Sequence, residues 1–200
     1  MYKKITTPLR DEDINALNAG DRVLLSGVIY TARDAAHKRM HEALQKGQAL
    51  PIDIRQQVMY YAGPCPARPG MVAGPFGPTT SGRMDKFAPE LIAMGLKGMI
   101  GKGDRTNQVV EAMKEGNAVY FAAIGGIGAY IAATIKSQEV IAYEELGAEA
   151  LIKLEVSDLP LIVAIDSRGN NLYLTEPLKY KDKFTEIISD KKELTGIINE

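Results

Sequence analysis

A short polar stretch at residues 77–85, GPTTSGRMD, brings together side chains that can hold an anion. Thr79, Thr80 and Ser81 supply hydroxyl groups, and Arg83 adds a guanidinium that can bind a carboxylate through two parallel hydrogen bonds. The flanking glycines and proline predict a loop rather than a regular element. Threonine hydroxyls in such a loop also bond to the main chain, so a structural role for Thr79 and Thr80 is a second interpretation.

Two further cations also follow predicted strands. Arg33 comes after the apolar run 22–30, and Lys102 lies in the segment GKGDR after the run 98–101. Because sites in α/β proteins form where strands end, a sheet can bring Arg33, Arg83 and Lys102 to one edge. Two arginines and a lysine, close to helix N-termini, suit a small dicarboxylate. Taken alone, Arg33 and Lys102 are more simply explained as surface residues, whereas the donor-rich loop around Arg83 makes a binding role and a surface role equally good explanations.

The histidines and the single cysteine offer other chemistry, with less support. His37 and His41 lie one helical turn apart, a spacing that can bind a metal, but no third ligand accompanies them. Cys65 lies between two prolines and is interpreted as a small apolar residue of a turn rather than as a nucleophile. A four-iron cluster needs three or four thiolates, so we expect no metal site in this chain alone.

Two glycine-bearing segments suggest a nucleotide- or phosphate-binding α/β protein as an alternative. GKGDR fails the phosphate-loop pattern, which needs glycine where Leu96 stands and a hydroxyl where Gly103 stands. AIGGIGA at 123–129 lacks the spacing of a dinucleotide fingerprint. Its glycines are more simply explained by a tight strand-to-helix turn and close packing.

Composition narrows the class of protein. The 200 residues suit one domain, and 24 Lys and Arg balance 25 Asp and Glu, which disfavours nucleic acid as a partner. The first residues lack the apolar region of a signal peptide, and no apolar stretch reaches the length of a membrane span. We therefore expect a cytoplasmic protein without membrane contact.

Apolar runs alternate with amphipathic stretches, which predicts an α/β fold. Strands are expected at 22–30, 57–63, 70–77, 98–101, 118–124, 139–143, 159–166 and 171–174. Helices are expected at 31–47, 87–95, 106–115 and 127–136, the first with Thr31 and Asp34 as a capping box and Gly47 as terminator. One domain would occupy 1–200, with its core at about 2–175 and a charged helical extension at about 178–200.

Six segments occur in the same order in the β subunit, or C-terminal domain, of iron–sulfur class I fumarases and tartrate dehydratases. They are TARDAAHKRM, YYAGP, GPTTSGRMD, GKGDR, AIGGIGA and KLEVSDLPLIVAIDSRGN. The chain resembles this family from about residue 2 to residue 175, and GPTTSGRMD is the most specific of the six segments.

The resemblance implies a reversible hydro-lyase of two subunits, forming a hetero-oligomer. A separate α subunit would hold a [4Fe–4S] cluster whose free iron binds the substrate hydroxyl and one carboxylate. This chain would be the mobile, swivelling β/β/α-type domain with a mixed sheet that closes over the cluster. The family's pocket residues correspond here to Arg33, Thr79, Arg83 and Lys102. Thr79 would be the general base, activated by a carboxylate of the α subunit, and the three cations would hold the substrate carboxylates and the developing charge.

The resemblance also bears on the substrate. GRMD and the pattern GKGxR are typical of fumarase-type members, which favours hydration of fumarate to malate. A β subunit of L-tartrate dehydratase, which converts tartrate to oxaloacetate, is the alternative, because side chains of the α subunit could decide between such similar substrates. A non-catalytic partner that only stabilises another chain is a third hypothesis. It differs from the first in whether Thr79, Arg83 and Lys102 meet on one exposed surface.

Overall fold

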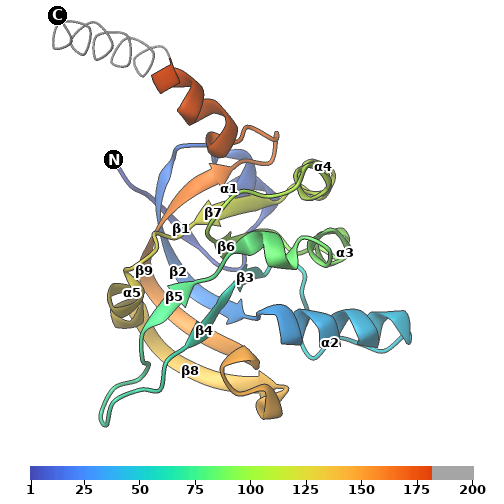
Figure 1. Ribbon diagram of the computed structural model, residues 1–200, viewed down its shortest axis with the longest axis vertical. Coiled ribbons are helices and arrows are strands. Elements are labelled where there is room, and N and C mark those ends of the chain that lie inside the picture. Colours follow the sequence, from blue (N-terminus) through green and yellow to red (C-terminus); the bar gives the residue numbers. More distant parts are fainter. Residues whose placement is uncertain (182–200) are drawn as a thin grey trace, which may run out of the picture.

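Seven strands form one mixed sheet in the computed structural model, which describes residues 1–181 (Figure 1). In the order β1-β2-β3-β6-β7-β9-β8, neighbouring strands from β1 to β7 are parallel, whereas β9 is antiparallel to β7 and β8. The fold class predicted from the sequence, α/β with a mixed sheet, is confirmed. The strands are β1 (Lys3–Thr6), β2 (Arg22–Thr31), β3 (Val58–Tyr60), β6 (Gly98–Gly101), β7 (Val119–Ala122), β8 (Ile135–Ala142) and β9 (Leu151–Ile165).

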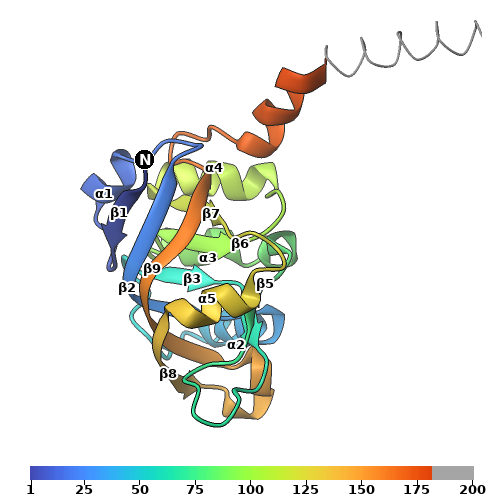
Figure 2. The same cartoon turned by 90° about the vertical axis from the view of Figure 1, so that its left-hand side faces the viewer.

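The sheet closes on itself because β9 pairs with β2 as well as with β7. Figure 2 shows β2 and β9 crossing the molecule side by side. Successive side chains of a strand point to opposite faces, so Val58 and Tyr60 belong to the apolar core inside the curved sheet. Met59 and Tyr61 belong to a second core on its outer face.

Helices pack on both sides of this sheet. The outer core includes residues of α2 (Asp34–Gln45), α3 (Ala88–Ala93) and α4 (Asn107–Gly116), which lie along the same side in Figure 1. Ile131 of α5 (Gly128–Thr134) joins the inner core instead. The short helix α1 (Asp11–Asn15) follows β1. None of the helices among the described residues is long and apolar enough to cross a bilayer.

Two small elements carry the polar loop singled out in the sequence. A separate two-stranded sheet joins β4 (Ala62–Pro64) to β5 (Phe76–Pro78), and the 3-10 turn η1 (Ser81–Met84) follows β5. A second turn, η2 (Glu144–Glu149), lies between β8 and β9. The loop from β5 to η1 is thereby placed beside the ends of the central strands.

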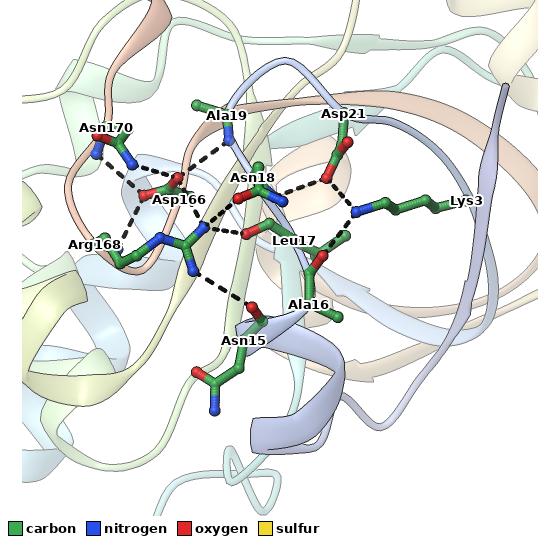
Figure 3. Close-up of polar contacts among 10 residues, drawn as sticks. All are labelled: Lys3, Asn15, Ala16, Leu17, Asn18, Ala19, Asp21, Asp166, Arg168 and Asn170. Atoms are coloured by element: carbon green, nitrogen blue, oxygen red, sulfur yellow. Dashed lines mark hydrogen bonds and ion pairs between the residues drawn. The ribbon is translucent and has the colours of Figure 1, made fainter.

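The turn after β9 is anchored by the buried carboxylate of Asp166 (Figure 3). It accepts hydrogen bonds from the main-chain N–H groups of Ala19, Arg168 and Asn170 and from the Asn170 side chain, at 2.8–3.2 Å. Arg168 in turn donates to the carbonyl of Leu17, 2.7 Å away. The segment DSRGN therefore ties the end of β9 to the chain that enters β2.

Several predicted strands differ from the observed ones. The expected strand 57–63 divides after Tyr60 into β3 and β4, and only the end of 70–77 forms a strand, in β5. The run 159–166 is the second half of β9, and 139–143 is the second half of β8. The predicted strand 171–174 is wrong, because residues 172–181, the last that the structure describes, are helical. Asn171 starts this helix by accepting the N–H of Tyr173 at 2.9 Å.

The first predicted helix begins later than expected. Thr31 ends β2 and is buried, so the predicted capping box with Asp34 is wrong. The carboxylate of Glu149 accepts the free N–H of Ala35 instead, at 2.9 Å. Gly47 ends the helix with a positive φ of 67°, as predicted. The helices predicted at 87–95, 106–115 and 127–136 correspond to α3, α4 and α5, while the extension predicted beyond residue 181 lies outside the described residues.

Candidate active site

The residues predicted to bind substrate come from neighbouring strand ends. Arg33 is the N-cap of α2, two residues after β2, and Lys102 directly follows β6. Thr79 directly follows β5, and Arg83 lies in η1. Because β2, β3 and β6 are parallel neighbours, their carboxyl ends share one edge of the sheet.

Main-chain hydrogen bonds fasten the Thr79 loop to the end of β6. The N–H of Lys102 donates to the carbonyl of Thr79 at 3.2 Å, and the N–H of Ser81 donates to the carbonyl of Lys102 at 2.9 Å. Gly101 allows this approach, since a Cβ atom there would lie 1.9 Å from Ser81 Oγ. Lys102 and Arg83 themselves remain exposed to solvent.

The hydroxyl of Thr79 faces the main chain. Both its Oγ1–H and its N–H donate to the carbonyl of Tyr61, each at 2.8 Å. This contact agrees with the structural interpretation of the loop hydroxyls. Thr80 is exposed and bridges to Lys102 through its main chain. The two threonines therefore have different surroundings.

Both candidate arginines are already paired with carboxylates of this chain. Arg83 donates from Nε to Asp34 Oδ1 at 2.9 Å, and its Nη2 lies 2.8 Å from Asp34 Oδ2. Arg33 Nη2 lies 3.4 Å from Glu149 Oε1. Asp34 is the first residue of α2 and Glu149 accepts an N–H of its first turn, so the helix N-terminus holds both carboxylates. Gly63 of β4 lies against Arg33, where a Cβ would come within 3.1 Å of Nη1.

A buried ion pair that the sequence did not point to lies in the same two loops. Arg105 donates from Nε to Asp85 Oδ1 at 2.6 Å, and the Arg105 side chain has no exposed surface. Its guanidinium carbon lies 5.3 Å from the ring centre of Tyr61 and 5.0 Å from that of Tyr120. Burial opposes the charge, but Tyr61 and Asp85 raise the pKa of Arg105 above its usual value. The segments GRMD and GKGDR contain both partners, but spacing alone does not pair them.

The two histidines serve different contacts. His37 is buried, its Nδ1 lies 2.9 Å from the carbonyl of Arg33, and burial lowers its pKa to about 4. The carbonyl can only accept, so Nδ1 carries the proton of a neutral ring. His41 Nδ1 lies 2.7 Å from Glu90 Oε2 on α3. Among residues 1–181 no three His, Cys, Asp or Glu side chains are grouped as a metal site would require.

The remaining motifs are explained by backbone geometry. Gly126 has a positive φ of 87°, and a Cβ on Gly128 would lie 3.1 Å from the main-chain nitrogen of Gly77. These glycines therefore permit a tight turn and the close packing of α5 on β5. Cys65 is exposed in the loop after β4, and its N–H donates to the carbonyl of Pro75 at 3.0 Å.

Comparison with known proteins agrees with the motif order. The family model described as Fumarase C-terminus matches residues 3–176. The chain belongs to the fumarase C-terminus family. It is 41% identical to the aerobic class I fumarate hydratase of Escherichia coli K12 over 154 residues, which cover 76% of this chain and 28% of that protein. Fumarate hydratase 2 of Leishmania major is 37% identical over 164 residues, which cover 81% of this chain and 29% of that protein.

A further relative has nearly the same length as this chain. It is the putative L(+)-tartrate dehydratase subunit beta of Methanocaldococcus jannaschii, 37% identical over 186 residues, which cover 90% of this chain and 95% of the relative. The chain thus spans less than a third of the fumarate hydratases that it resembles and almost all of a β subunit. The family resemblance seen in the sequence is confirmed.

Proposed function

We propose that this chain is the β subunit of a two-subunit iron–sulfur hydro-lyase that reversibly hydrates fumarate to malate. The observation that carries the proposal is the joining of the Thr79 and Lys102 loops at one exposed edge of the sheet, with Arg83 in the same loop as Thr79. A chain that only stabilised a partner would not need two exposed cations grouped beside the Thr79 loop. The likeness to a β subunit along almost its whole length supports the division into two chains.

Arg33, Arg83 and Lys102 are proposed to bind the substrate carboxylates. Asp34 and Glu149 fix the two arginines before substrate arrives, which leaves other N–H groups of each guanidinium free to donate to an incoming carboxylate. Preorganised donors stabilise developing negative charge without reorganising during the reaction. Lys102 has an exposed ammonium and is proposed to supply the point charge that completes this set.

Thr79 is proposed to take the proton from the carbon next to a carboxylate. A neutral hydroxyl can accept a proton only if it passes its own proton to a stronger base. In the present conformation the Thr79 proton is donated to the Tyr61 carbonyl, which is not such a base. The proposal therefore requires a carboxylate from the partner subunit and a turn of the hydroxyl towards it, so that the site is complete only when the two subunits meet.

The residues of this chain do not fit a four-iron cluster. The sequence has a single cysteine, and the described residues contain no group of three possible metal ligands. A cluster needs three or four thiolates, so in the proposed enzyme it belongs to the α subunit. The proposal thus comprises a hetero-oligomer with a cluster-bearing chain, a small dicarboxylate substrate and the cytoplasmic location expected from the sequence.

Dehydration of L-tartrate to oxaloacetate is the second candidate function. It is favoured by the relative of matching length, whose name is that of a putative L(+)-tartrate dehydratase subunit. The cations of this chain would serve either dicarboxylate, because both substrates present two carboxylates to them. The preference is therefore expected to depend on contacts to the additional hydroxyl.

Anaerobic purification from the native source tests the proposal. We expect a cysteine-containing chain with a cluster to co-purify, and the complex to hydrate fumarate faster than it dehydrates L-tartrate. The isolated chain, treated with iron and sulfide, should fold but remain colourless and inactive. A stable cluster or hydro-lyase activity in the isolated chain would overturn the two-subunit proposal. A reversed substrate preference would replace fumarase by tartrate dehydratase.

A further inference from the structure

The ion pair of Arg105 and Asp85 lies where charge is costly. The side chains are 0% and 7% exposed, and the Arg105 guanidinium lies close to two tyrosine rings. Its Nη1 donates a weak hydrogen bond to the sulfur of Met99, 3.4 Å away. Removing two charges from water is expensive, and apolar pairs of similar volume often stabilise a fold equally well. The stability of the fold alone therefore does not explain why a buried ion pair is present here.

The pair joins the two loops that carry the candidate substrate cations. Asp85 follows η1 and is two residues from Arg83, whereas Arg105 is three residues from Lys102. The second oxygen of Asp85 accepts the N–H of Thr106 at 2.7 Å, so one carboxylate holds two consecutive residues of the Lys102 loop.

A second buried contact joins the same loops through Tyr120 of β7. Its hydroxyl lies 2.8 Å from Ser81 Oγ and donates to the carbonyl of Gly103 at 2.9 Å. Tyr120 also lies against the Arg105 guanidinium. The ion pair and the tyrosine therefore form one buried unit beneath η1 and the loop after β6.

We infer that Arg105 and Asp85 are positioning residues, which clamp η1 to the loop after β6 and so fix Arg83 relative to Lys102. The inference rests on the proposed function for the roles of Arg83 and Lys102, but the clamp itself is a property of the loops. A displacement of about 1 Å in a binding group can cost ~100-fold in rate, so a loosened clamp should be visible in catalysis.

The test uses three variants of the full chain and two readouts. Arg105→Lys keeps the charge but loses the planar group that lies close to both tyrosine rings, and Asp85→Asn keeps the shape but loses the charge. Asp85→Leu combined with Arg105→Met replaces the pair by apolar side chains. Arg55→Lys is the matched control, because Arg55 pairs with Asp53 on the exposed surface.

The first readout is amide hydrogen exchange of the isolated chain. We expect exchange at Ser81 and Lys102, whose N–H groups bond across the two loops, to rise by ~10-fold or more in all three variants. Exchange at Gly20, which bonds to Val163 elsewhere in the fold, should rise far less. The second readout is kinetics of the assembled enzyme, where kcat/KM should fall by ~10- to 100-fold. The control Arg55→Lys should leave both the amide exchange rates and kcat/KM unchanged.

Two outcomes would overturn the clamp. One is that the apolar pair shows wild-type exchange at Ser81 and Lys102 together with wild-type kcat/KM. The other is that exchange rises equally at Gly20, which would make the pair a general stabiliser. If the assembled enzyme acts on neither dicarboxylate, the proposed function fails, and the exchange experiment still decides the clamp separately.

Discussion

Asp34 holds Arg83 in a two-point ion pair, with Nε–Oδ1 and Nη2–Oδ2 distances of 2.9 and 2.8 Å. Asp34 directly follows Arg33, whose own guanidinium is paired with Glu149. The two arginines proposed to bind substrate are therefore oriented by the first turn of one helix. Their geometry is set before any substrate arrives, and a residue without a planar fork cannot reproduce it.

Replacing Arg83 should weaken substrate binding in the assembled enzyme. Arg83→Ala removes charged hydrogen bonds worth ~1.5 to 3 kcal/mol, so we expect KM to rise by ~10- to 150-fold. Arg83→Lys should recover little of this loss. The planar guanidinium can donate to Asp34 and to a substrate carboxylate at once, whereas the ammonium of lysine cannot reproduce this geometry. Lys86→Ala, which removes another exposed cation beside η1, is the control. Wild-type KM and kcat in Arg83→Ala would reduce this arginine to a structural residue of the loop.

The buried His37 should make the isolated chain less stable in mild acid. Its pKa is lowered from 6.5 to about 4, so the unfolded chain takes up this proton first as the pH falls. Above pH ~6.5 His37 does not change the free energy of unfolding. Between pH ~6.5 and ~4 this free energy decreases, and His37 alone accounts for a loss of up to about 3 kcal/mol. Urea denaturation at several pH values across this window measures the loss.

Two variants identify the source of that acid sensitivity. His37→Gln should flatten the decrease between pH ~6.5 and ~4, although it lowers stability at neutral pH by disturbing the contact with the Arg33 carbonyl. His41→Gln should keep the decrease, because His37 is still present. Carboxylates whose pKa is lowered by the fold, such as Asp166, lose their contribution only below pH ~4. An identical pH profile for wild type and His37→Gln would show that His37 is not the group responsible.

Asp166 is expected to stabilise the fold rather than the site. Asp166→Ala leaves the N–H groups of Ala19, Arg168 and Asn170 without their acceptor (Figure 3), so we expect a loss of ~3 kcal/mol in the free energy of unfolding. Glu139→Ala, in which an exposed carboxylate 4.0 Å from Lys153 is removed, should cost less than ~1 kcal/mol. Urea midpoints of the two variants measure the difference, and equal losses would refute the anchoring role.

The strand ends that carry the candidate site residues could be predicted from the sequence better than the helix cap of α2 and the long-range hydrogen-bond partners. Apolar runs and the glycines after them are local signals, so the sequence alone predicts that Arg33, Arg83 and Lys102 follow strands and can meet at one sheet edge. The N-terminus of α2 was predicted wrongly, because its cap comes from Glu149, more than a hundred residues further along the chain. A capping pattern in the sequence cannot reveal an acceptor supplied by another element.

The same limit explains the missed residues and the wrong strand. Arg105 and Asp85 are twenty residues apart, and only the tertiary fold buries them together, with the Arg105 guanidinium close to two tyrosine rings. The segment 171–174 has apolar and aromatic residues typical of a strand, but the side chain of Asn171 starts a helix there. Short apolar runs do not distinguish strand from helix when an acceptor of this kind precedes them.

Substitutions at Thr79 and Thr80 separate proton transfer from substrate binding. If its hydroxyl takes the substrate proton, Thr79→Ala should lower kcat of the assembled enzyme by ~10² to 10⁴ while KM changes little, because the cations still hold the carboxylates. Thr80→Ala should do much less, since Thr80 contributes its main chain to the contact with Lys102. Thr79→Ser should retain part of the activity, because it keeps the hydroxyl and loses only the methyl group that restricts its rotamer.

The contact with Tyr61 makes this comparison sharper. Thr79→Ala also removes a hydrogen bond to the Tyr61 carbonyl, whereas the bond from the Thr79 N–H to the same carbonyl remains. A loop that was merely loosened would therefore raise exchange at the Ser81 and Lys102 amides and disturb KM through Arg83, and both effects are measurable. A fall in kcat with unchanged amide exchange and unchanged KM assigns the loss to the hydroxyl itself. Equally mild effects of Thr79→Ala and Thr80→Ala would place the base on the partner subunit and leave this loop with binding alone.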